Sequence, residues 1–154
     1  MINETESRFA KKLLHPVRSS REQDMFEHWD MEGGFLNSRF KFDVKGMKKF
    51  NRSDDQVQDQ MALVELTNVR GNPGWIKGKA DYIALERKDY WLIVDREELL
   101  RMVEKNLGEP SAWSFKKTPY AIYDRKKFGK QDQFCWVPFK DIEDLDNVHK
   151  INHD

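Results

Sequence analysis

Two short segments of alternating polarity constrain the fold of this chain most strongly. In the segment 40–45, FKFDVK, Asp43 and Lys45 point to one side of an extended strand, and the apolar residues between them point to the other. In the segment 61–67, MALVELT, Glu65 lies in a similar apolar run. A carboxylate in such a run is costly to bury without a partner. The pattern therefore predicts two neighbouring strands whose acids face a cation, either a basic side chain or a metal ion.

The rest of the chain predicts a mixture of helices and strands. Gly33 and Gly34 are expected to end the second helix, and residues 70–74 to form a turn. The element order favours a mixed α/β fold in a single domain over residues 1–154, with a central mixed sheet of four to five strands flanked by helices. Periodicity and capping residues predict helices over 4–14, 19–29, 95–108 and 140–145, and strands over 39–47, 61–69, 80–85, 90–94 and 134–139.

Composition narrows the class of protein only slightly. Lys and Arg number 27 and so do Asp and Glu, so the absence of net charge neither requires nor excludes a nucleic-acid partner. The single cysteine, Cys135, rules out an internal disulfide and suits a reducing compartment. No segment approaches the length of a membrane span, and the acidic start lacks the layout of a signal peptide. We therefore expect a cytoplasmic protein.

Five short motifs carry a resemblance to a known family. They are EHWD at 27–30, FDVKG at 42–46, VELTN at 64–68, GW at 74–75 and ADYI at 80–83. Together they resemble the PD-(D/E)XK nuclease superfamily, and more narrowly its small nuclease-like proteins in phages and bacteria. The resemblance covers residues 20–107, with a looser likeness over Arg125 and residues 136–139. It implies a restriction-endonuclease-like core that hydrolyses phosphodiester bonds in DNA, or in RNA, with Mg²⁺ or Mn²⁺.

The resemblance also implies roles for individual residues. In that superfamily an Asp on one strand and a Glu-x-Lys on the next bind Mg²⁺ and activate water. Asp43 matches the first acid and Glu65 the second, with the backbone carbonyl of Leu66 as a further ligand. Thr67 stands where the lysine is usual, and its neutral hydroxyl stabilises developing negative charge poorly. Lys45 is the expected substitute, because it shares a strand face with Asp43.

Other residues are assigned to the site on weaker patterns. Glu27, on the preceding predicted helix, is the best candidate for a supporting acid, with Glu22 as its rival. The histidines form no metal-ligand spacing with a cysteine, so zinc is not expected. Basic and aromatic residues in two segments are expected to contact phosphates and bases: Arg70, Trp75, Lys77, Tyr123, Arg125 and Lys127.

Three interpretations of these residues stay open. The first is a metal-dependent endonuclease with Lys45 as its lysine, for which a two-fold dimer would suit cleavage of both strands of a duplex. The second is a catalytically degenerate scaffold that binds nucleic acid or another protein, as an accessory factor or an inhibitor. The third is that Asp43 and Glu65 pair with Lys45 and Arg70 in ordinary salt bridges between strands.

Overall fold

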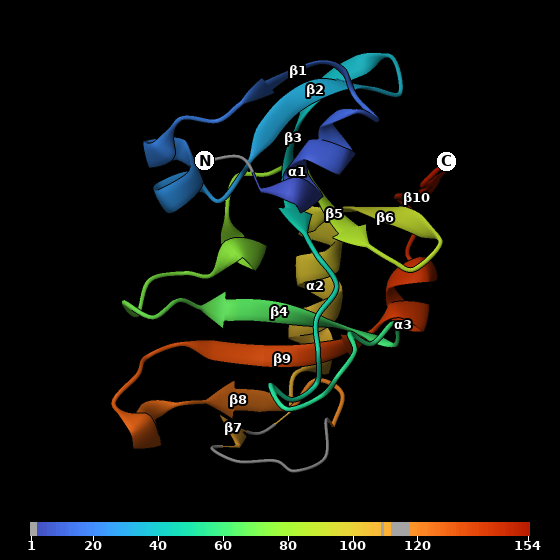
Figure 1. Cartoon of the computed structure of the whole chain (residues 1–154). Coiled ribbons are helices and arrows are strands. Elements are labelled where there is room, and N and C mark those ends of the chain that lie inside the picture. Colours follow the sequence, from blue (N-terminus) through green and yellow to red (C-terminus); the bar gives the residue numbers. More distant parts are fainter. Residues whose placement is uncertain (1–2, 109, 112–117) are drawn as a thin grey trace.

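Two β-sheets form the framework of the protein (Figure 1). The computed structural model describes residues 3–108, 110–111 and 118–154. In the larger sheet β3 and β5 are parallel, and the other neighbouring strands are antiparallel, so the sheet is mixed. Its six strands lie in the order β1 (Leu14–Arg18), β2 (Met31–Phe35), β3 (Ser38–Lys45), β5 (Tyr82–Glu86), β6 (Tyr90–Asp95) and β10 (Val148–Asn152).

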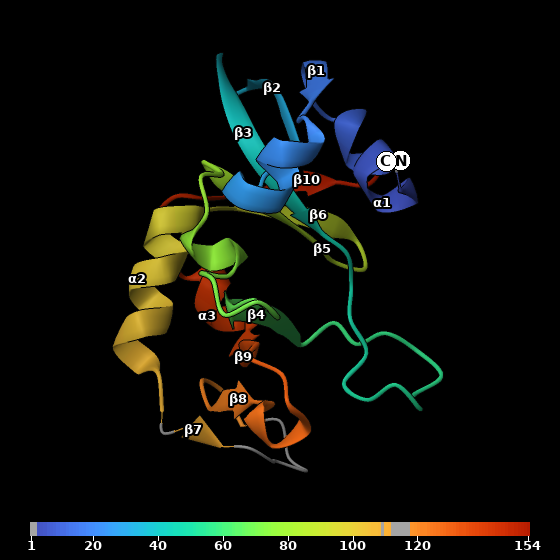
Figure 2. The ribbon, with the colours of Figure 1, turned by 90° about the vertical axis from the view of Figure 1, so that its left-hand side faces the viewer.

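The second sheet is smaller and lies below the first in Figures 1 and 2. Its strands follow the order β4 (Met61–Thr67), β9 (Gln133–Pro138), β8 (Ile122–Asp124) and β7 (Pro110–Ser111). The described helical segments are α1 (Glu4–Ala10), α2 (Arg96–Asn106), α3 (Phe139–Glu143), the π-helical turn η1 (Gln23–Glu27), and the 3-10 turns η2 (Trp75–Lys77) and η3 (Lys126–Phe128). None of these helices has the length and hydrophobicity needed to cross a bilayer.

Both faces of the larger sheet are buried, which explains why its central strands are apolar almost throughout. On one face Phe42 and Val44 of β3 pack with Phe9 of α1. On the other face Ile83 of β5 packs in a second core with Leu99 of α2. That second core also holds the buried residues of β4 and β9, so the two sheets share it. Because side chains alternate along β3, Asp43 and Lys45 belong to this second side.

Several predictions are confirmed. The protein is mixed α/β, and strands form in each of the five predicted segments. The helix predicted to begin at Asp95 is α2, and the Asp95 side chain accepts a hydrogen bond from the Glu98 amide at 2.9 Å.

The two predicted N-terminal helices are wrong in extent. The first ends at Ala10, and the chain is extended again from Leu14 in β1, ahead of the His15-Pro16 step that disfavours helix. The second is reduced to the turn η1, and Gly33 and Gly34 lie within β2. A β-carbon on Gly33 would lie 2.8 Å from the Leu13 side chain, so this glycine allows the close approach of the segment before β1.

The predicted pairing of the two acid-bearing strands is also wrong. β3 has β2 on one edge and β5 on the other, so neither of its hydrogen-bonding edges is available to β4. β4 instead pairs with β9 in the second sheet. The central sheet accordingly has six strands rather than four to five, and Asp43 and Glu65 belong to different sheets.

Candidate functional site

The β2–β3 hairpin brings two aspartates together. Its loop consists of Leu36 and Asn37, with φ of 50° and 66°, the two-residue turn whose twist matches that of the flanking strands. The register of the hairpin puts Asp30, which directly precedes β2, beside Asp43 of β3.

Hydrogen bonds fix Asp30 on both its backbone and its side chain. Its amide donates to the carbonyl of Phe42 at 2.7 Å, and its own carbonyl accepts from the Ser19 amide at 2.9 Å. One carboxylate oxygen, Oδ2, accepts from the Val44 amide at 2.7 Å. The carboxyl group is therefore held against β3, next to Asp43.

Asp43 is buried with an incomplete set of partners. Its exposed fraction is 3%, and Oδ1 lies 3.2 Å from the Lys45 ammonium nitrogen. In the part of the chain that the structure describes, its other oxygen, Oδ2, has no hydrogen-bond partner. A buried, unpartnered carboxylate oxygen is costly and therefore uncommon.

The three charged groups shift one another's protonation. Burial, followed by the negative charge of Asp43, raises the pKa of Asp30 to about 8. Burial also raises the pKa of Asp43, against the opposing effect of Lys45. For Lys45 burial favours the neutral form, but the carboxylates of Asp43, Asp30 and Glu65 outweigh it and raise the pKa. Near neutral pH the Asp30 carboxyl group therefore holds a proton, whereas the Asp43 carboxylate faces the Lys45 ammonium.

The turn η2, which packs on β4 of the second sheet, contacts Lys45. The Lys45 ammonium lies 5.0 Å from the centre of the Trp75 ring in η2, and Trp75 is 6% exposed. A β-carbon on Gly74 would lie 2.2 Å from the carbonyl oxygen of Glu65, so only glycine lets the chain before η2 lie directly on β4. This contact sets Trp75 beneath Lys45 and brings Glu65 within electrostatic reach of the ammonium.

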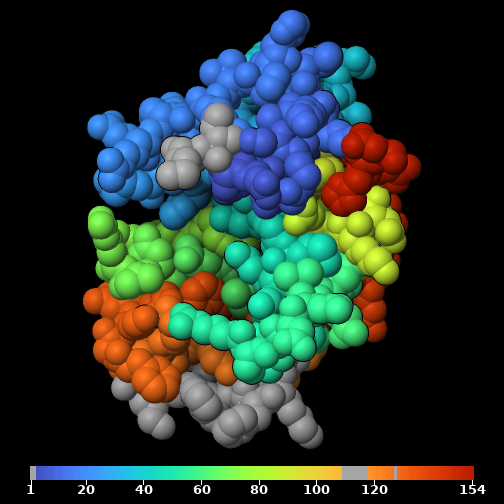
Figure 3. All heavy atoms as spheres, viewed as in Figure 1, coloured from blue at the N-terminus to red at the C-terminus, as the bar shows by residue number. Residues whose placement is uncertain are grey.

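A pocket of about 380 Å³ opens beside Asp30. Glu6 of α1 and Asp24 of η1 line it with Asp30, and Arg18 and Arg21 add positive charge. Burial and the charge of Asp30 raise the pKa of Glu6, while its partner Arg18, at 3.2 Å, opposes this. The surface of the molecule is hollowed between the blue N-terminal part and the green segment near residues 70–80 (Figure 3).

The donor set fits a small, hard divalent cation. Among the described residues, no group of three or more His, Cys, Asp or Glu side chains is arranged to hold a metal ion. Mg²⁺, however, usually takes only one or two carboxylates and completes its shell with water and phosphate oxygens. Asp30 and Asp43 are such a pair of carboxyl groups, and Oδ2 of Asp43 has no hydrogen-bond partner among the described residues.

The residues predicted from β4 take other positions. Glu65 is partly buried in the second sheet and reaches the site only through its electrostatic effect on Lys45. The carbonyl of Leu66 accepts a hydrogen bond from the Gly74 amide at 3.0 Å. Thr67 directs its hydroxyl to Gln133 Oε1 at 3.3 Å, on β9.

Glu27, predicted as a supporting acid, is held by a neighbour. Its carboxylate accepts a hydrogen bond from the Trp29 indole at 3.0 Å. The acids that act on Asp43 are instead Asp30 and, more weakly, Asp24. The signal for Asp30 was Asn37, a residue typical of a two-residue hairpin loop, between segments that alternate in polarity.

Some of the side chains predicted to contact nucleic acid are exposed to solvent, and others are packed inside the protein. Arg70 and Lys77 are exposed, whereas Trp75 is buried under Lys45 and offers no face for a base. Gly71 lies against Gln131, so the 70–74 turn adjoins the loop that carries Arg125.

Arg125 and its predicted neighbours belong to the second sheet. The Arg125 guanidinium forms an ion pair with Asp132, and its Nε donates to the two carboxylate oxygens at 3.1 Å and 2.9 Å. Tyr123 is partly buried in β8, opposite Phe134 of β9. The side chain of Lys127 lies outside the described residues.

Comparisons of the chain with protein-family models, with curated proteins and with solved structures find no match.

Proposed function

We propose that this protein is a metal-dependent phosphodiesterase that cleaves nucleic acid, with DNA as the expected substrate. One observation carries the proposal: the buried carboxylate of Asp43 keeps one oxygen without a partner, beside a second carboxyl group, that of Asp30. In an ordinary structural ion pair both oxygens would be satisfied. A divalent cation would supply what this pair lacks.

This proposal reassigns the acid-x-lysine motif. Asp43, Val44 and Lys45 have that spacing themselves, and Asp30, directly before the adjacent strand β2, is then the preceding acid. Thr67 no longer occupies the lysine position, so its neutral hydroxyl does not argue against catalysis.

Each residue of the centre has a distinct task. Asp30 and Asp43 would hold Mg²⁺ or Mn²⁺. The ion, when bound, lowers the pKa of a water ligand and neutralises charge on the phosphate. Lys45 keeps its proton, because three carboxylates raise its pKa, so its ammonium donates to a phosphate oxygen as negative charge develops there. Glu6 has a raised pKa and lines the same pocket as Asp30, which suits it to hold a proton near the reacting groups.

The basic side chains around the pocket suit a polyanionic substrate. Arg18 and Arg21 line it, and Arg70 and Lys77 are exposed on the 70–77 segment. Positively charged groups of this kind position phosphates without reading sequence. The whole chain has no net charge, so these groups would act locally.

A cleavage assay tests the proposal. The purified protein is incubated with linear, circular, single-stranded and branched DNA and with RNA, in Mg²⁺ and then in Mn²⁺. We expect metal-dependent cleavage that falls by roughly a thousandfold or more in Asp43→Asn and Asp30→Asn, since each removes a ligand charge. Asp55→Asn, at an exposed acid of the 46–60 loop, is the matched control and should cleave normally.

Two results would contradict the proposal. The first is full activity in Asp43→Asn, which would remove the centre assigned here. The second is a parent protein that binds nucleic acid in a salt-sensitive manner and cleaves none of these substrates with either metal. That second result would favour the alternative, a binding module that has lost cleavage.

A further inference from the structure

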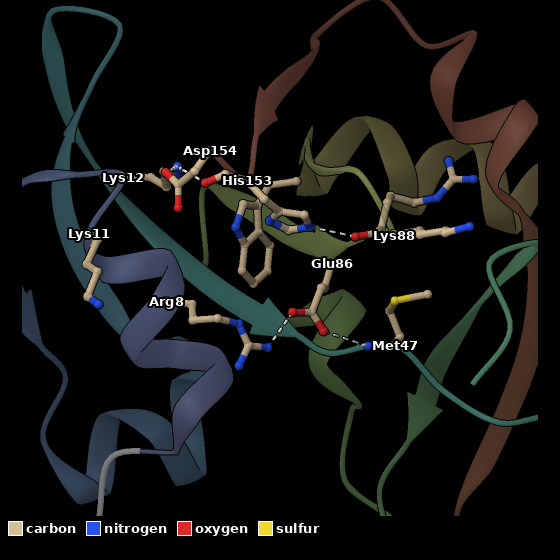
Figure 4. Close-up of a pocket in the computed structure, with 10 residues that line it drawn as sticks. Arg8, Lys11, Lys12, Met47, Glu86, Lys88, His153 and Asp154 are labelled. Atoms are coloured by element: carbon tan, nitrogen blue, oxygen red, sulfur yellow. Dashed lines mark hydrogen bonds and ion pairs between the residues drawn. The ribbon is translucent and has the colours of Figure 1, made fainter. Parts of the chain in front are cut away.

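A second pocket, of about 480 Å³, lies on the other side of α1 (Figure 4). Its walls are α1, the β5–β6 turn and the last two residues, His153 and Asp154. Lys11 stands at one side of it and Lys88 at the opposite side (Figure 4). The candidate site described above does not use these residues.

Positive charge dominates the lining of this pocket. Its acidic residues are Glu86 and Asp154. Five basic side chains against these two acidic ones leave an excess of three positive charges. The basic side chains are Arg8, Lys11, Lys12, Arg87 and Lys88.

Only some of these cations are neutralised within the fold. Arg8 pairs with Glu86 at 2.5 Å, and Lys12 pairs with Asp154 at 2.8 Å. Arg87 is held by Asp59 and Glu143, away from the two acids of the pocket. Lys11 and Lys88 form no hydrogen bond or ion pair within the described residues.

A buried donor without an acceptor marks the same pocket. Trp91 lines it with an exposed fraction of 0%, and its indole Nε1 has no hydrogen-bond partner among the described residues. The ring packs edge-on against His153, with centroids 5.6 Å apart. A buried N–H group is normally satisfied, so this indole is a donor for which the described residues supply no acceptor.

Shared lining residues link the second pocket to the candidate site. A smaller hollow lined by Lys45, Met47 and Glu86 lies between the two. Lys45 belongs to the centre with Asp43, whereas Met47 and Glu86 also line the second pocket. Extended chain rises about 3.3 Å per residue, so Lys45 and Met47 are less than roughly 7 Å apart along the backbone. The second pocket therefore begins within two residues of Lys45.

We infer that this second pocket binds the terminal phosphate of a nucleic-acid strand whose body lies over Asp43, an inference that rests on the proposed function. A phosphate monoester is an acceptor with nearly two negative charges, which matches the excess of cations and the unpartnered Trp91 donor better than a singly charged diester does. The bound end would set the distance from the strand terminus to the cleavage position.

The affinity of the protein for oligonucleotides with different terminal groups tests this inference. Fluorescence anisotropy in EDTA compares one labelled oligonucleotide with a 5′-phosphate, a 3′-phosphate or hydroxyl ends only. We expect one phosphate-bearing form to bind about tenfold more tightly than the hydroxyl form, the effect of a hydrogen-bonded charge pair. The preference should disappear in Lys11→Gln/Lys88→Gln, whose side chains form no hydrogen bond or ion pair among the described residues. Lys105→Gln/Lys140→Gln, at exposed lysines of α2 and α3, is the control.

A spectroscopic measurement locates the phosphate independently of nucleic acid. The indole N–H resonance of Trp91, assigned with Trp91→Phe, should shift when inorganic phosphate is added to the protein. The shift should saturate at higher phosphate concentration in Lys11→Gln/Lys88→Gln than in the parent.

The outcomes separate this inference from the proposed function. Asp43-dependent cleavage with no preference for a phosphate end, or with a preference that survives in Lys11→Gln/Lys88→Gln, overturns the pocket and leaves the nuclease standing. If no nucleic acid is bound at all, both the proposed function and the strand-end assignment fail. A Trp91 shift in that case would identify a site for small phosphates instead.

Discussion

Two buried aspartates in this molecule meet a basic side chain in different ways. Asp132 is 0% exposed, and both of its carboxylate oxygens accept hydrogen bonds from the guanidinium of Arg125. Burial disfavours its charge, but the hydrogen bonds and positive charge of Arg125 outweigh burial and lower its pKa. The pair is complete in itself.

Asp43 is almost as deeply buried but is far less well satisfied. Lys45 contacts one oxygen at 3.2 Å, and Oδ2 finds no partner in the described part of the chain. Its neighbour, directly before β2, is a second carboxyl group, Asp30, and burial raises the pKa of both acids.

This contrast distinguishes a structural ion pair, Arg125–Asp132, from a site in which a carboxylate oxygen of Asp43 is still able to bind a ligand. A planar guanidinium offers a fork of donors that can satisfy a carboxylate completely, whereas an ammonium acts as a single point of charge. Arg125 and Asp132 therefore hold the loop 125–132 together. Asp43 keeps one oxygen without a partner, and Asp30 beside it holds a proton that a cation could replace, a pattern that is typical of functional sites.

The largest expected effect is on stability. Asp132→Asn should lower the free energy of unfolding by about 3 kcal/mol, because it leaves the Arg125 guanidinium without its counter-charge. Asp43→Asn should change it by less than about 1 kcal/mol, or raise it, because the lost Lys45 contact is offset by removal of an unsatisfied buried charge. Urea denaturation at pH 7 measures both. Equal losses in the two variants would show that Asp43 is an ordinary structural residue.

The sequence predicted which segments form strands more accurately than it predicted which strands pair with each other. Alternation in β3 and the continuous apolar runs of β5 and β6 reflect burial, which a local pattern records. The partner of β4 could not be predicted in this way, because strand pairing depends on which edges other strands have already occupied. Both edges of β3 are taken by β2 and β5, and this information is spread over the whole chain.

The same limit applies to the site. Asp43 and Lys45 were predicted from their shared face on one strand, and the structure shows them in contact. The sequence does not predict Asp30, because its pattern favours a helix that ends at Gly33 and Gly34 rather than a strand through them. Their role is steric: a β-carbon on Gly34 would lie 2.8 Å from the Leu14 side chain, a contact with β1 that no local pattern records.

The second prediction concerns pH and added metal. The pKa of Asp30 is raised from 3.8 to about 8, so the folded state holds this proton more tightly than the unfolded state. The resulting stabilisation is complete below about pH 4 and is lost as the pH rises through about 8. The free energy of unfolding should therefore fall between pH 5 and 8, and Asp30→Asn should flatten that slope.

Magnesium should reverse the loss, because it replaces the proton that Asp30 gives up. At a hundredfold excess over its Kd the ion would stabilise the folded protein by about 2.7 kcal/mol. The rise in Tm should be larger at pH 8 than at pH 5.5, measured by thermal unfolding in Mg²⁺ against EDTA. The Asp132 pair is complete without metal, so Asp132→Asn should show the same metal-induced rise as the parent. A rise that is independent of pH, or that persists in Asp43→Asn, would place the metal elsewhere.

The smallest expected effect is on the cleavage rate, and it distinguishes substitutions on β4 from substitutions on the β2–β3 hairpin. Glu65 acts on the centre only through the charge of Lys45, so Glu65→Gln should reduce cleavage by a few-fold, about 0.5 to 1 kcal/mol in the barrier. Thr67→Lys should leave the rate within about twofold, because the Thr67 hydroxyl points to Gln133 in the second sheet. Lys45→Met, by contrast, should reduce cleavage at least a hundredfold, since a charge that stabilises the transition state is lost. Single-turnover rates in saturating Mg²⁺ measure all three. A hundredfold loss in Glu65→Gln, or a large gain in Thr67→Lys, would return the acid-x-lysine motif to β4.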